Sequence, residues 1–253
     1  MLFRSNMIIP CCRKKEETPH CSAVIVAAGS SQRMGSDKLL HNLGIMPVLA
    51  RTLLVFQDCE LVDEIVVVTR MEKLEEVAEL CKKYRIEKAS KVICGGATRM
   101  ESALAGVSEV KKKAKLIAIH DGARPLVSVE LIENTVRAAA KYKAAVPAIK
   151  SVDTLKLAED GETVTGSLDR ELVLRVQTPQ VFDADLIKGA LTFAAEKKLP
   201  LTDDCSAVEL MGVKARIVPG EEDNIKLTTP RDMLFAAAIL KDRGEYLADR
   251  AWV

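Results

Sequence analysis

The feature that most constrains the fold is the alternation of short apolar runs with longer helical patterns along the chain. Runs rich in β-branched residues, bounded by glycine, proline or charge, predict buried strands. They occupy residues 23–27, 65–69, 91–94, 116–120 and 145–149. Patterns in which apolar residues return every three or four positions predict helices. They occupy residues 47–56, 72–84, 98–110, 129–142, 183–196, 203–211 and 230–241. This order predicts an α/β fold with a Rossmann-like, mostly parallel sheet and helices on both faces.

The composition of the 253 residues narrows the class of protein further. With 48% hydrophobic residues the chain can form a sizeable core, as one large domain or two small ones. A net charge of +1 and only 4% aromatic residues are not typical of nucleic-acid binding, so we expect small anions as partners and no nucleic acid. No apolar run approaches the roughly 18 residues that span a membrane, so we expect no membrane partner. The seven cysteines form no CxxC pair, which is typical of reduced thiols and indicates a cytoplasmic protein.

The periodic patterns also suggest where the domain begins and ends. They lie within residues 22–241, which we interpret as one catalytic domain. Residues 1–21 combine several basic residues with the vicinal pair Cys11 and Cys12, and we interpret them as a disordered N-terminal extension. An organelle-targeting peptide is the alternative, although Glu16 and Glu17 are unusual in such acid-poor segments. Residues 242–253 are interpreted as a C-terminal tail.

One segment breaks the alternation of strand and helix. Residues 154–157 and 162–165 alternate in polarity and flank the turn dipeptide Asp160-Gly161, which predicts a hairpin. The whole arm would span about residues 151–170. A projecting hairpin that no helix covers is marginal alone and is stabilised by packing against a second subunit. We therefore expect a homodimer formed through this arm.

Three glycine-containing loops with a cation follow the predicted strands, at residues 28–38, 95–99 and 121–125. The first belongs to the run AAGSSQRMGSDK at residues 27–38, whose small side chains allow backbone N–H groups to reach an anion. It is not a dinucleotide fingerprint, because Ser31 stands where that motif has its second glycine. It is not a P-loop either, because Met34 stands where the P-loop motif has its second glycine. Arg33 and Lys38 in this loop are suited to neutralising a triphosphate. An ordinary strand–helix turn with solvated charges is the alternative.

Small residues followed by Arg33-Met34 and then a lysine resemble the signature of sugar-phosphate nucleotidyltransferases. Six further motifs resemble, in order, those of the 2-C-methyl-D-erythritol 4-phosphate cytidylyltransferase family. They are GGATRMES at residues 95–102, HDGARP at 120–125, DR at 169–170, QTPQ at 177–180, TDD at 202–204 and DNIK at 223–226. Their ordered recurrence over residues 22–241 is far more specific than any one of them. The chain departs from the family pattern around the catalytic lysine, where it has Asp37 and Leu39, and at Ala97.

The resemblance implies a reaction in which CTP and a phosphorylated polyol give a cytidine diphosphate product and pyrophosphate. It also implies Mg²⁺ as cofactor, bound mainly through the CTP phosphates, with Asp121 as a possible further contact. A phosphate monoester has a second pKa near about 6, so the attacking phosphate is ionised without a protein base. Catalysis would therefore depend on positioning and on charge neutralisation.

The resemblance also implies a role for particular residues. The catalytic cations would be Arg33, Lys38, Lys226 and Arg170. The nucleotide would be bound by Ala27, Ala28, Gly29, Gly96, Ala97 and Ser102. The polyol phosphate would be bound by Asp121, Arg124, Thr178, Thr202 and Lys226, with Thr154 and Arg170 supplied by the arm of the neighbouring subunit. His120 has no further metal ligands in its motif, and we interpret it as a strand-end histidine.

Three other functions stay open from the sequence. A ribitol 5-phosphate cytidylyltransferase would share most of these motifs. A noncatalytic CTP-binding dimer would keep the fold but would have no use for Lys38. An NAD-dependent dehydrogenase would need an acidic residue about 20 positions after the glycine turn, and the region near Leu49 offers none.

Overall fold

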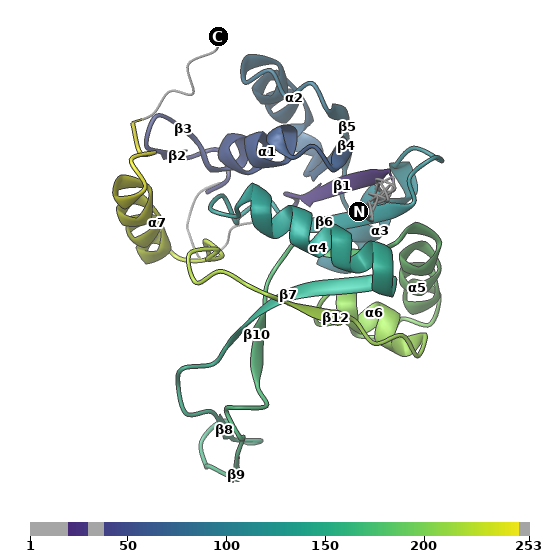
Figure 1. Ribbon diagram of the computed structural model, residues 1–253, viewed down its shortest axis with the longest axis vertical. Coiled ribbons are helices and arrows are strands. Elements are labelled where there is room, and N and C mark those ends of the chain that lie inside the picture. Colours follow the sequence, from purple (N-terminus) through teal and green to yellow (C-terminus); the bar gives the residue numbers. More distant parts are fainter. Residues whose placement is uncertain (1–19, 30–37, 248–253) are drawn as a thin grey trace, which may run out of the picture.

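The computed structural model describes residues 20–29 and 38–247 (Figure 1). Its centre is an eight-stranded sheet with the strand order β10-β7-β11-β6-β1-β4-β5, in which β12 pairs with β7. These strands are β1 (Cys21–Val26), β4 (Val62–Thr69), β5 (Ala89–Cys94), β6 (Leu116–Asp121), β7 (Ala144–Lys150), β10 (Leu174–Val176), β11 (Gln180–Asp183) and β12 (Arg216–Pro219). The predicted α/β class with a mostly parallel sheet is confirmed.

The parallel part of the sheet decides where a site can form. Strand β1 lies between β4 and β6 and is parallel to both, and β5 continues the parallel order beyond β4. In this register Val26 is opposite Asp121 on one side and Val68 on the other. The carboxyl ends of β1, β4, β5 and β6 therefore meet at one edge, and the loops that follow them come together there.

Helices cover both faces of the sheet, as the alternation predicts. They are α1 (Val48–Asp58), α2 (Leu74–Lys83), α3 (Arg99–Glu109), α4 (Val129–Tyr142), α5 (Ala184–Glu196), α6 (Asp204–Leu210) and α7 (Pro230–Asp242). One core cluster joins the sheet to α1, α2, α4 and α7, and the other joins it to α3, α5 and α6. Helix α3 packs closely because of Gly106, where an added Cβ would lie 2.3 Å from a methyl carbon of Val24.

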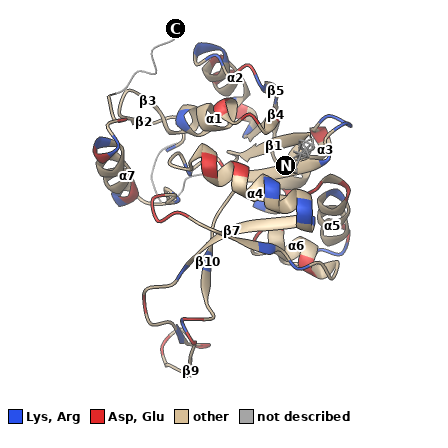
Figure 2. Cartoon of the chain, in the orientation of Figure 1, with Lys and Arg blue, Asp and Glu red and all other residues tan. Residues whose placement is uncertain are grey.

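Helix α4 illustrates how local sequence fixes an element. Its bounds coincide with the predicted residues 129–142. The hydroxyl of Ser128 accepts the backbone N–H of Leu131 and so caps the first turn. Figure 2 shows acidic residues at its start and basic residues toward its end, which complements the helix dipole.

Several elements differ from the sequence predictions. The pattern at 72–84 is divided between a short 3₁₀ turn, η2 (Met71–Lys73), and α2. Three strands of the main sheet, β10, β11 and β12, were not predicted, and β10 and β11 run antiparallel to their neighbours. A small hairpin of β2 (Asn42–Leu43) and β3 (Met46–Pro47) also precedes α1.

The arm projects from the sheet between β7 and β10 (Figure 1). Its short antiparallel pair is β8 (Lys156–Leu157) and β9 (Gly166–Ser167). The predicted hairpin is therefore present, but its second strand follows the stretch 162–165 that was predicted to form it. Asp160 organises the turn, because its carboxylate accepts the backbone N–H groups of Glu162 and Thr163.

The chain beyond α7 contacts the domain instead of leaving it. The buried guanidinium of Arg51 donates to the carbonyl oxygens of Leu43, Glu245 and Tyr246. The predicted tail at 242–253 thus begins as packed structure, while residues 248–253 lie outside the described residues. Within the described ranges, none of the helices has the length and apolar character needed to cross a bilayer.

Candidate active site

A cavity of about 600 Å³ opens at the carboxyl edge of the parallel strands. It is lined by residues from the loops after β1, β5 and β6 and from the segment before α7. The lining residues are Val26, Ala27, Ala28, Gly29, Lys38, Leu39, Gly96, Ala97, Thr98, Arg99, Ser102, Asp121, Ala123, Lys226 and Thr228. Its position is that of ligand sites in open parallel sheets.

Two small-residue loops form one wall of the cavity. The backbone N–H of Ala27 donates to the carbonyl of Val68 at 2.7 Å, which fixes the first loop to the sheet. The second loop approaches closely because of Gly95, where an added Cβ would lie 2.8 Å from the Cβ of Ala28 and 2.6 Å from the Ser102 hydroxyl. Neither side chain could move far enough, so this position favours glycine.

Ser102 stabilises the second loop through side-chain hydrogen bonds to its backbone. Its side chain is 2% exposed, and its Oγ accepts the N–H of Gly96 and donates to the carbonyl of Thr98. The loop ends where α3 begins, and Thr98 and Glu101 form a capping box there. Ser102 thus lines the cavity, with its hydroxyl already engaged by the loop, and its contact with the nucleotide stays a prediction.

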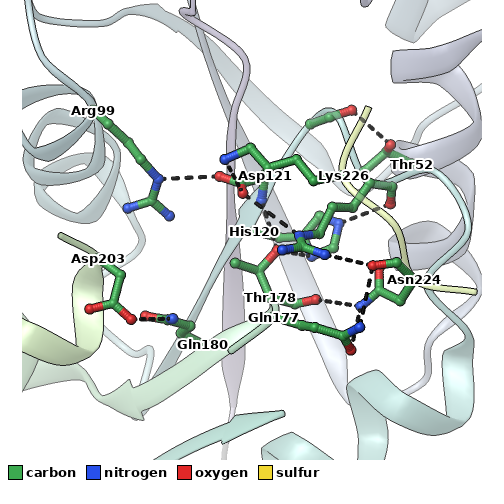
Figure 3. Close-up of polar contacts among 12 residues, drawn as sticks. Thr52, Arg99, His120, Asp121, Gln177, Thr178, Gln180, Asp203, Asn224 and Lys226 are labelled. Carbon is green, nitrogen blue, oxygen red and sulfur yellow. Dashed lines mark hydrogen bonds and ion pairs between the residues drawn. The ribbon is translucent and has the colours of Figure 1, made fainter. Parts of the chain in front are cut away.

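A cluster of cations around Asp121 forms another wall of the cavity (Figure 3). Arg99 and Lys226 line the cavity, and Arg124 is not among the lining residues. Nε of Arg99 donates to Oδ1 of Asp121 at 3.2 Å, and Nζ of Lys226 lies 2.7 Å from Oδ2. Nε of Arg124 lies 3.8 Å from the same Oδ2. Burial would raise the pKa of the Asp121 carboxyl, but the three cations outweigh it and hold that pKa well below its usual range. Asp121 is therefore a fixed anion that gathers positive charge at the cavity wall.

Arg99 and Asp204 are part of this wall, and the sequence analysis gave neither a role. Two nitrogens of Arg99 donate to the two carboxylate oxygens of Asp204, both at 2.8 Å. Asp204 is 1% exposed and lies at the start of α6. Burial lowers the pKa of Arg99, but the carboxylates of Asp204 and Asp121 raise it above its ordinary value. The only available signal was the presence of both residues within motifs.

A buried network holds the turn that carries Asp121 and Arg124. The side chain of Arg124 donates to the carbonyl of Asn224 in the segment before α7. Asn224 is fully buried, and its amide donates to the carbonyl of Thr178 at 3.0 Å. Asp121 donates its own backbone N–H to the Thr178 hydroxyl at 3.1 Å. Thr178 therefore lies beside the site, as predicted, but behind its wall.

The remaining predicted residues lie at different distances from the cavity. The hydroxyl of Thr202 bonds to that of Ser206, and Thr202 is not among the residues lining the cavity. Thr154 and Arg170 are exposed in the arm, and the ion partner of Arg170 is Glu171 at 4.0 Å, not Asp169 as considered. Arg33 lies outside the described residues.

The donor set around Asp121 does not fit a protein-held metal. Both carboxylate oxygens of Asp121 are occupied by cationic groups, so a divalent ion would have to displace them. Among the described residues there is no group of three His, Cys, Asp or Glu side chains that could hold a metal ion. The wall is built for anions.

The Rossmann-like fold and its structural neighbours, with a cavity lined by two small-residue loops and a cation cluster, place the protein in the class of nucleotidyltransferases. A model of the 2-C-methyl-D-erythritol 4-phosphate cytidylyltransferase family matches residues 21–242. The chain belongs to this family, as its motifs predicted.

Relatives and solved structures agree with this placement. The chain is 43% identical over 224 residues to the 2-C-methyl-D-erythritol 4-phosphate cytidylyltransferase of Halalkalibacterium halodurans, covering 88% of this chain and 97% of the relative. It is 40% identical to that of Caldanaerobacter subterraneus, covering 87% and 98%. The crystal structure of 4-diphosphocytidyl-2C-methyl-D-erythritol synthase from Anaerococcus prevotii matches with a TM-score of 0.79 and 33% identity, over 89% of this chain and 100% of that chain.

Proposed function

We propose that this chain transfers the cytidylyl group of CTP to 2-C-methyl-D-erythritol 4-phosphate in the non-mevalonate isoprenoid pathway. The products are 4-diphosphocytidyl-2-C-methyl-D-erythritol and pyrophosphate. The observation that carries the proposal is the cavity itself, in a member of this family, lined by two small-residue loops together with Lys38, Asp121 and Lys226. Family membership favours methylerythritol phosphate over ribitol phosphate as the acceptor.

The reaction joins two anions at one phosphorus atom. An oxygen of the polyol phosphate attacks the α-phosphorus of CTP, a new P–O bond forms, and the bond to the β-phosphate oxygen breaks as pyrophosphate leaves with the electron pair. The attacking oxygen is already ionised, so no protein group has to remove a proton. The protein has to align the two phosphates and stabilise the charge on the leaving group.

The two small-residue loops are assigned to the nucleotide. We assign the backbone of Ala27, Ala28 and Gly29 to the base and ribose side of CTP, together with that of Gly96 and Ala97. The N–H of Gly96 is donated to the Ser102 hydroxyl and that of Ala97 to Glu101, so the contacts of this loop to the base would come from its carbonyl groups. Backbone groups in fixed positions can distinguish the hydrogen-bonding edge of cytosine from that of other bases.

The cations are assigned to the phosphates. Lys38 lines the cavity, and we assign it, with Arg33 of the adjoining loop, to the triphosphate and the departing pyrophosphate. Lys226 lines the cavity beside Asp121, and we assign it with Arg124 to the phosphate of the polyol. Asp121 orients these cations, Thr202 would complete the polyol site, and Thr178 supports that site from behind through the backbone of Asp121. Arginine and lysine together provide directional and point-charge contacts to phosphate.

Magnesium is assigned to the substrate. Because the carboxylate of Asp121 is engaged by cations, we propose that Mg²⁺ enters bound to the CTP phosphates. The protein would then recognise the magnesium complex of CTP and would provide no metal cage of its own. Titration of Mg²⁺ without nucleotide, followed by calorimetry, should show no binding in the micromolar range; tight binding would contradict this assignment.

The arm is assigned to a homodimer. Val152, Val164 and Leu172 are 69%, 61% and 82% exposed in the single chain, so a partner surface would bury them. We propose that Thr154 and Arg170 reach the polyol site of the neighbouring subunit. Their exposure at the base of the arm, outside the cavity of their own chain, supports this.

Mixing two inactive variants tests whether the site is shared. In a mixed dimer of Lys38→Ala and Arg170→Ala chains, one site carries both defects and the other carries neither. We therefore expect activity to return on mixing after subunit exchange, toward half that of the wild type per exchanged dimer. Without recovery in a dimer shown to have exchanged, Arg170 would act within its own subunit.

The assay for the main proposal is pyrophosphate release with CTP, methylerythritol phosphate and Mg²⁺. A noncatalytic CTP-binding dimer is the competing function. It would bind CTP, and Lys38→Ala would leave its nucleotide turnover unchanged. We expect Lys38→Ala to remove most turnover. We further propose that residues 22–241 form the catalytic unit and that it acts in the cytoplasm, which the five described free thiols support.

A further inference from the structure

His120 is a fully buried histidine that no step of the proposed reaction uses. It is the penultimate residue of β6, directly before Asp121, and its ring packs against Phe56 with the ring centroids 4.9 Å apart. Both ring nitrogens have partners: Nδ1 lies 3.0 Å from the hydroxyl of Thr178, and Nε2 lies 3.2 Å from the carbonyl oxygen of Arg124 (Figure 3).

These partners determine the tautomer of the ring. A carbonyl oxygen can only accept, so Nε2 must carry the proton. Burial lowers the pKa of His120 to about 3, which leaves the ring neutral and Nδ1 without a proton. The hydroxyl of Thr178 must then donate to Nδ1. Its oxygen still accepts the backbone N–H of Asp121 at 3.1 Å.

The result is a continuous hydrogen-bond chain around one turn. It runs from the N–H of Asp121 through the Thr178 hydroxyl and the His120 ring to the carbonyl of Arg124. The two residues at its ends are Asp121, the anion at the centre of the cation cluster, and Arg124, one of its cations. In this series of hydrogen bonds, the hydroxyl proton of Thr178 is donated to Nδ1 of His120, and the side chain of Thr178 is buried. Thr178 therefore acts on the turn and does not donate to a polyol hydroxyl.

We propose that His120 and Thr178 are positioning residues, which hold the turn at residues 121–124 so that Asp121 and Arg124 face the phosphate of the acceptor. This inference rests on the proposed function. It differs from a packing role, because a packing role needs the volume of the ring and of the threonine side chain but neither hydrogen bond. Loss of the bonds alone should therefore loosen acceptor binding and leave the nucleotide loops intact.

Paired variants separate the bonds from the volume. Thr178→Val keeps the shape and removes the hydroxyl, while Thr178→Ser keeps the hydroxyl. His120→Phe keeps the ring against Phe56 and removes both bonds. His120→Asn keeps an acceptor near Nδ1, and His120→Gln keeps a donor near Nε2, so each should restore part of the loss.

Steady-state kinetics of the full-length dimer provide the test. We expect Thr178→Val and His120→Phe to raise KM for methylerythritol phosphate about tenfold, with KM for CTP changed less than twofold. Thr178→Ser should stay near the wild type. If His120→Phe does not fold, the Val and Ser pair at residue 178 carries the test. An unchanged KM for the acceptor in a folded Thr178→Val protein overturns the proposal.

Nitrogen NMR of the imidazole tests the same proposal without turnover. In the protein at neutral pH, Nε2 of His120 should be protonated and Nδ1 bare. The opposite tautomer would break the chain at Thr178 and overturn the inference, even if the enzyme is active. An inactive wild type with the expected tautomer would instead mean that the proposed function is wrong.

Discussion

The turn at residues 121–124 and the arm at residues 151–170 hold their shape in opposite ways. In the turn, Gly122 donates to the carbonyl of Val26, its own carbonyl accepts the hydroxyl of buried Thr52, and Ala123 accepts the N–H of Leu227. In the arm, a two-residue strand pair and one aspartate-centred turn provide the order, and large apolar side chains are exposed. The hydrogen bonds that hold the turn all come from one chain, whereas the exposed apolar side chains of the arm are suited to contact with a second chain.

This difference matches the roles proposed for the two regions. Stabilising charge in a transition state requires groups that are already oriented when the substrate arrives. The carboxylate of Asp121 is buried, and partners from three parts of the chain hold its cluster in place, so the cluster meets that requirement. Subunit contact requires exposed apolar area, which the arm provides. Substitutions in the first region should therefore change catalysis and stability, and substitutions in the second should change assembly.

The largest effect is expected at Lys226. Lys226→Met keeps the length of the side chain and removes the charge beside Asp121, so the acceptor phosphate loses a contact where charge develops. We expect kcat/KM to fall by about 10²–10³, measured by pyrophosphate release. Lys82→Met is the matched control, because Lys82 is exposed on α2, does not line the cavity and pairs with Glu79 on the same helix. A loss of similar size in both variants would contradict a specific role.

Arg99 should have the next largest effect, on stability. Arg99→Met leaves the buried carboxylate of Asp204 without its bidentate partner, which we expect to cost about 3 kcal/mol in the free energy of unfolding. Urea unfolding measures the loss. Adding Asp204→Leu removes the unpaired carboxylate and should restore part of the lost free energy of unfolding. A double variant no more stable than Arg99→Met would show that loss of the Arg99–Asp204 ion pair is not the cause of the destabilisation.

Val152 tests the arm. Val152→Ser removes an apolar side chain that is 69% exposed in the single chain, and we expect the dimer to dissociate about tenfold more readily in analytical ultracentrifugation. The free energy of unfolding of the separated chain should not change. Leu234→Ser on α7 is the control, because Leu234 is also exposed but lies outside the arm. Equal weakening by both variants would mean that the arm is not the interface.

The smallest effect is the pH dependence of stability that Asp121 contributes. Because the folded-state pKa of Asp121 is lowered, its contribution is complete above the unfolded pKa of about 3.9 and is lost as pH falls toward the folded value. The difference in unfolding free energy between the wild type and Asp121→Asn should therefore be equal at pH 7 and pH 5 and shrink below about pH 4. A difference that grows on acidification would contradict the cation cluster.

The fold was predictable from the sequence where a long periodic pattern of apolar residues was bounded by a residue that begins or ends a helix. The bounds of α4 were predicted without error because Ser128 caps it and its apolar stripe is regular. Strand β11 was missed because it has four residues between polar ends, and its pairing with β6 and β7 is a tertiary contact. The second arm strand was misplaced because alternation also occurs in exposed turns.

The candidate site was predictable where residues of one motif act together. The small residues of the two nucleotide loops and Asp121 follow neighbouring strands, so parallel topology alone brings them to one cavity. The pair of Arg99 and Asp204 was not predictable, because the two residues are 105 positions apart and no local pattern links them. The contact of His120 with Thr178 was not predictable for the same reason, because the two residues are far apart in the sequence and meet only where β11 pairs antiparallel with β6.

The most direct test of the proposed function is an acceptor and nucleotide panel with the full-length protein. Pyrophosphate release would be measured with methylerythritol phosphate and ribitol 5-phosphate, each with the magnesium complexes of CTP and UTP. We predict the highest kcat/KM for CTP with methylerythritol phosphate, and a product whose mass is that of the cytidine diphosphate adduct. Turnover with ribitol 5-phosphate alone, or none with any pair while CTP still binds, would contradict the proposed function.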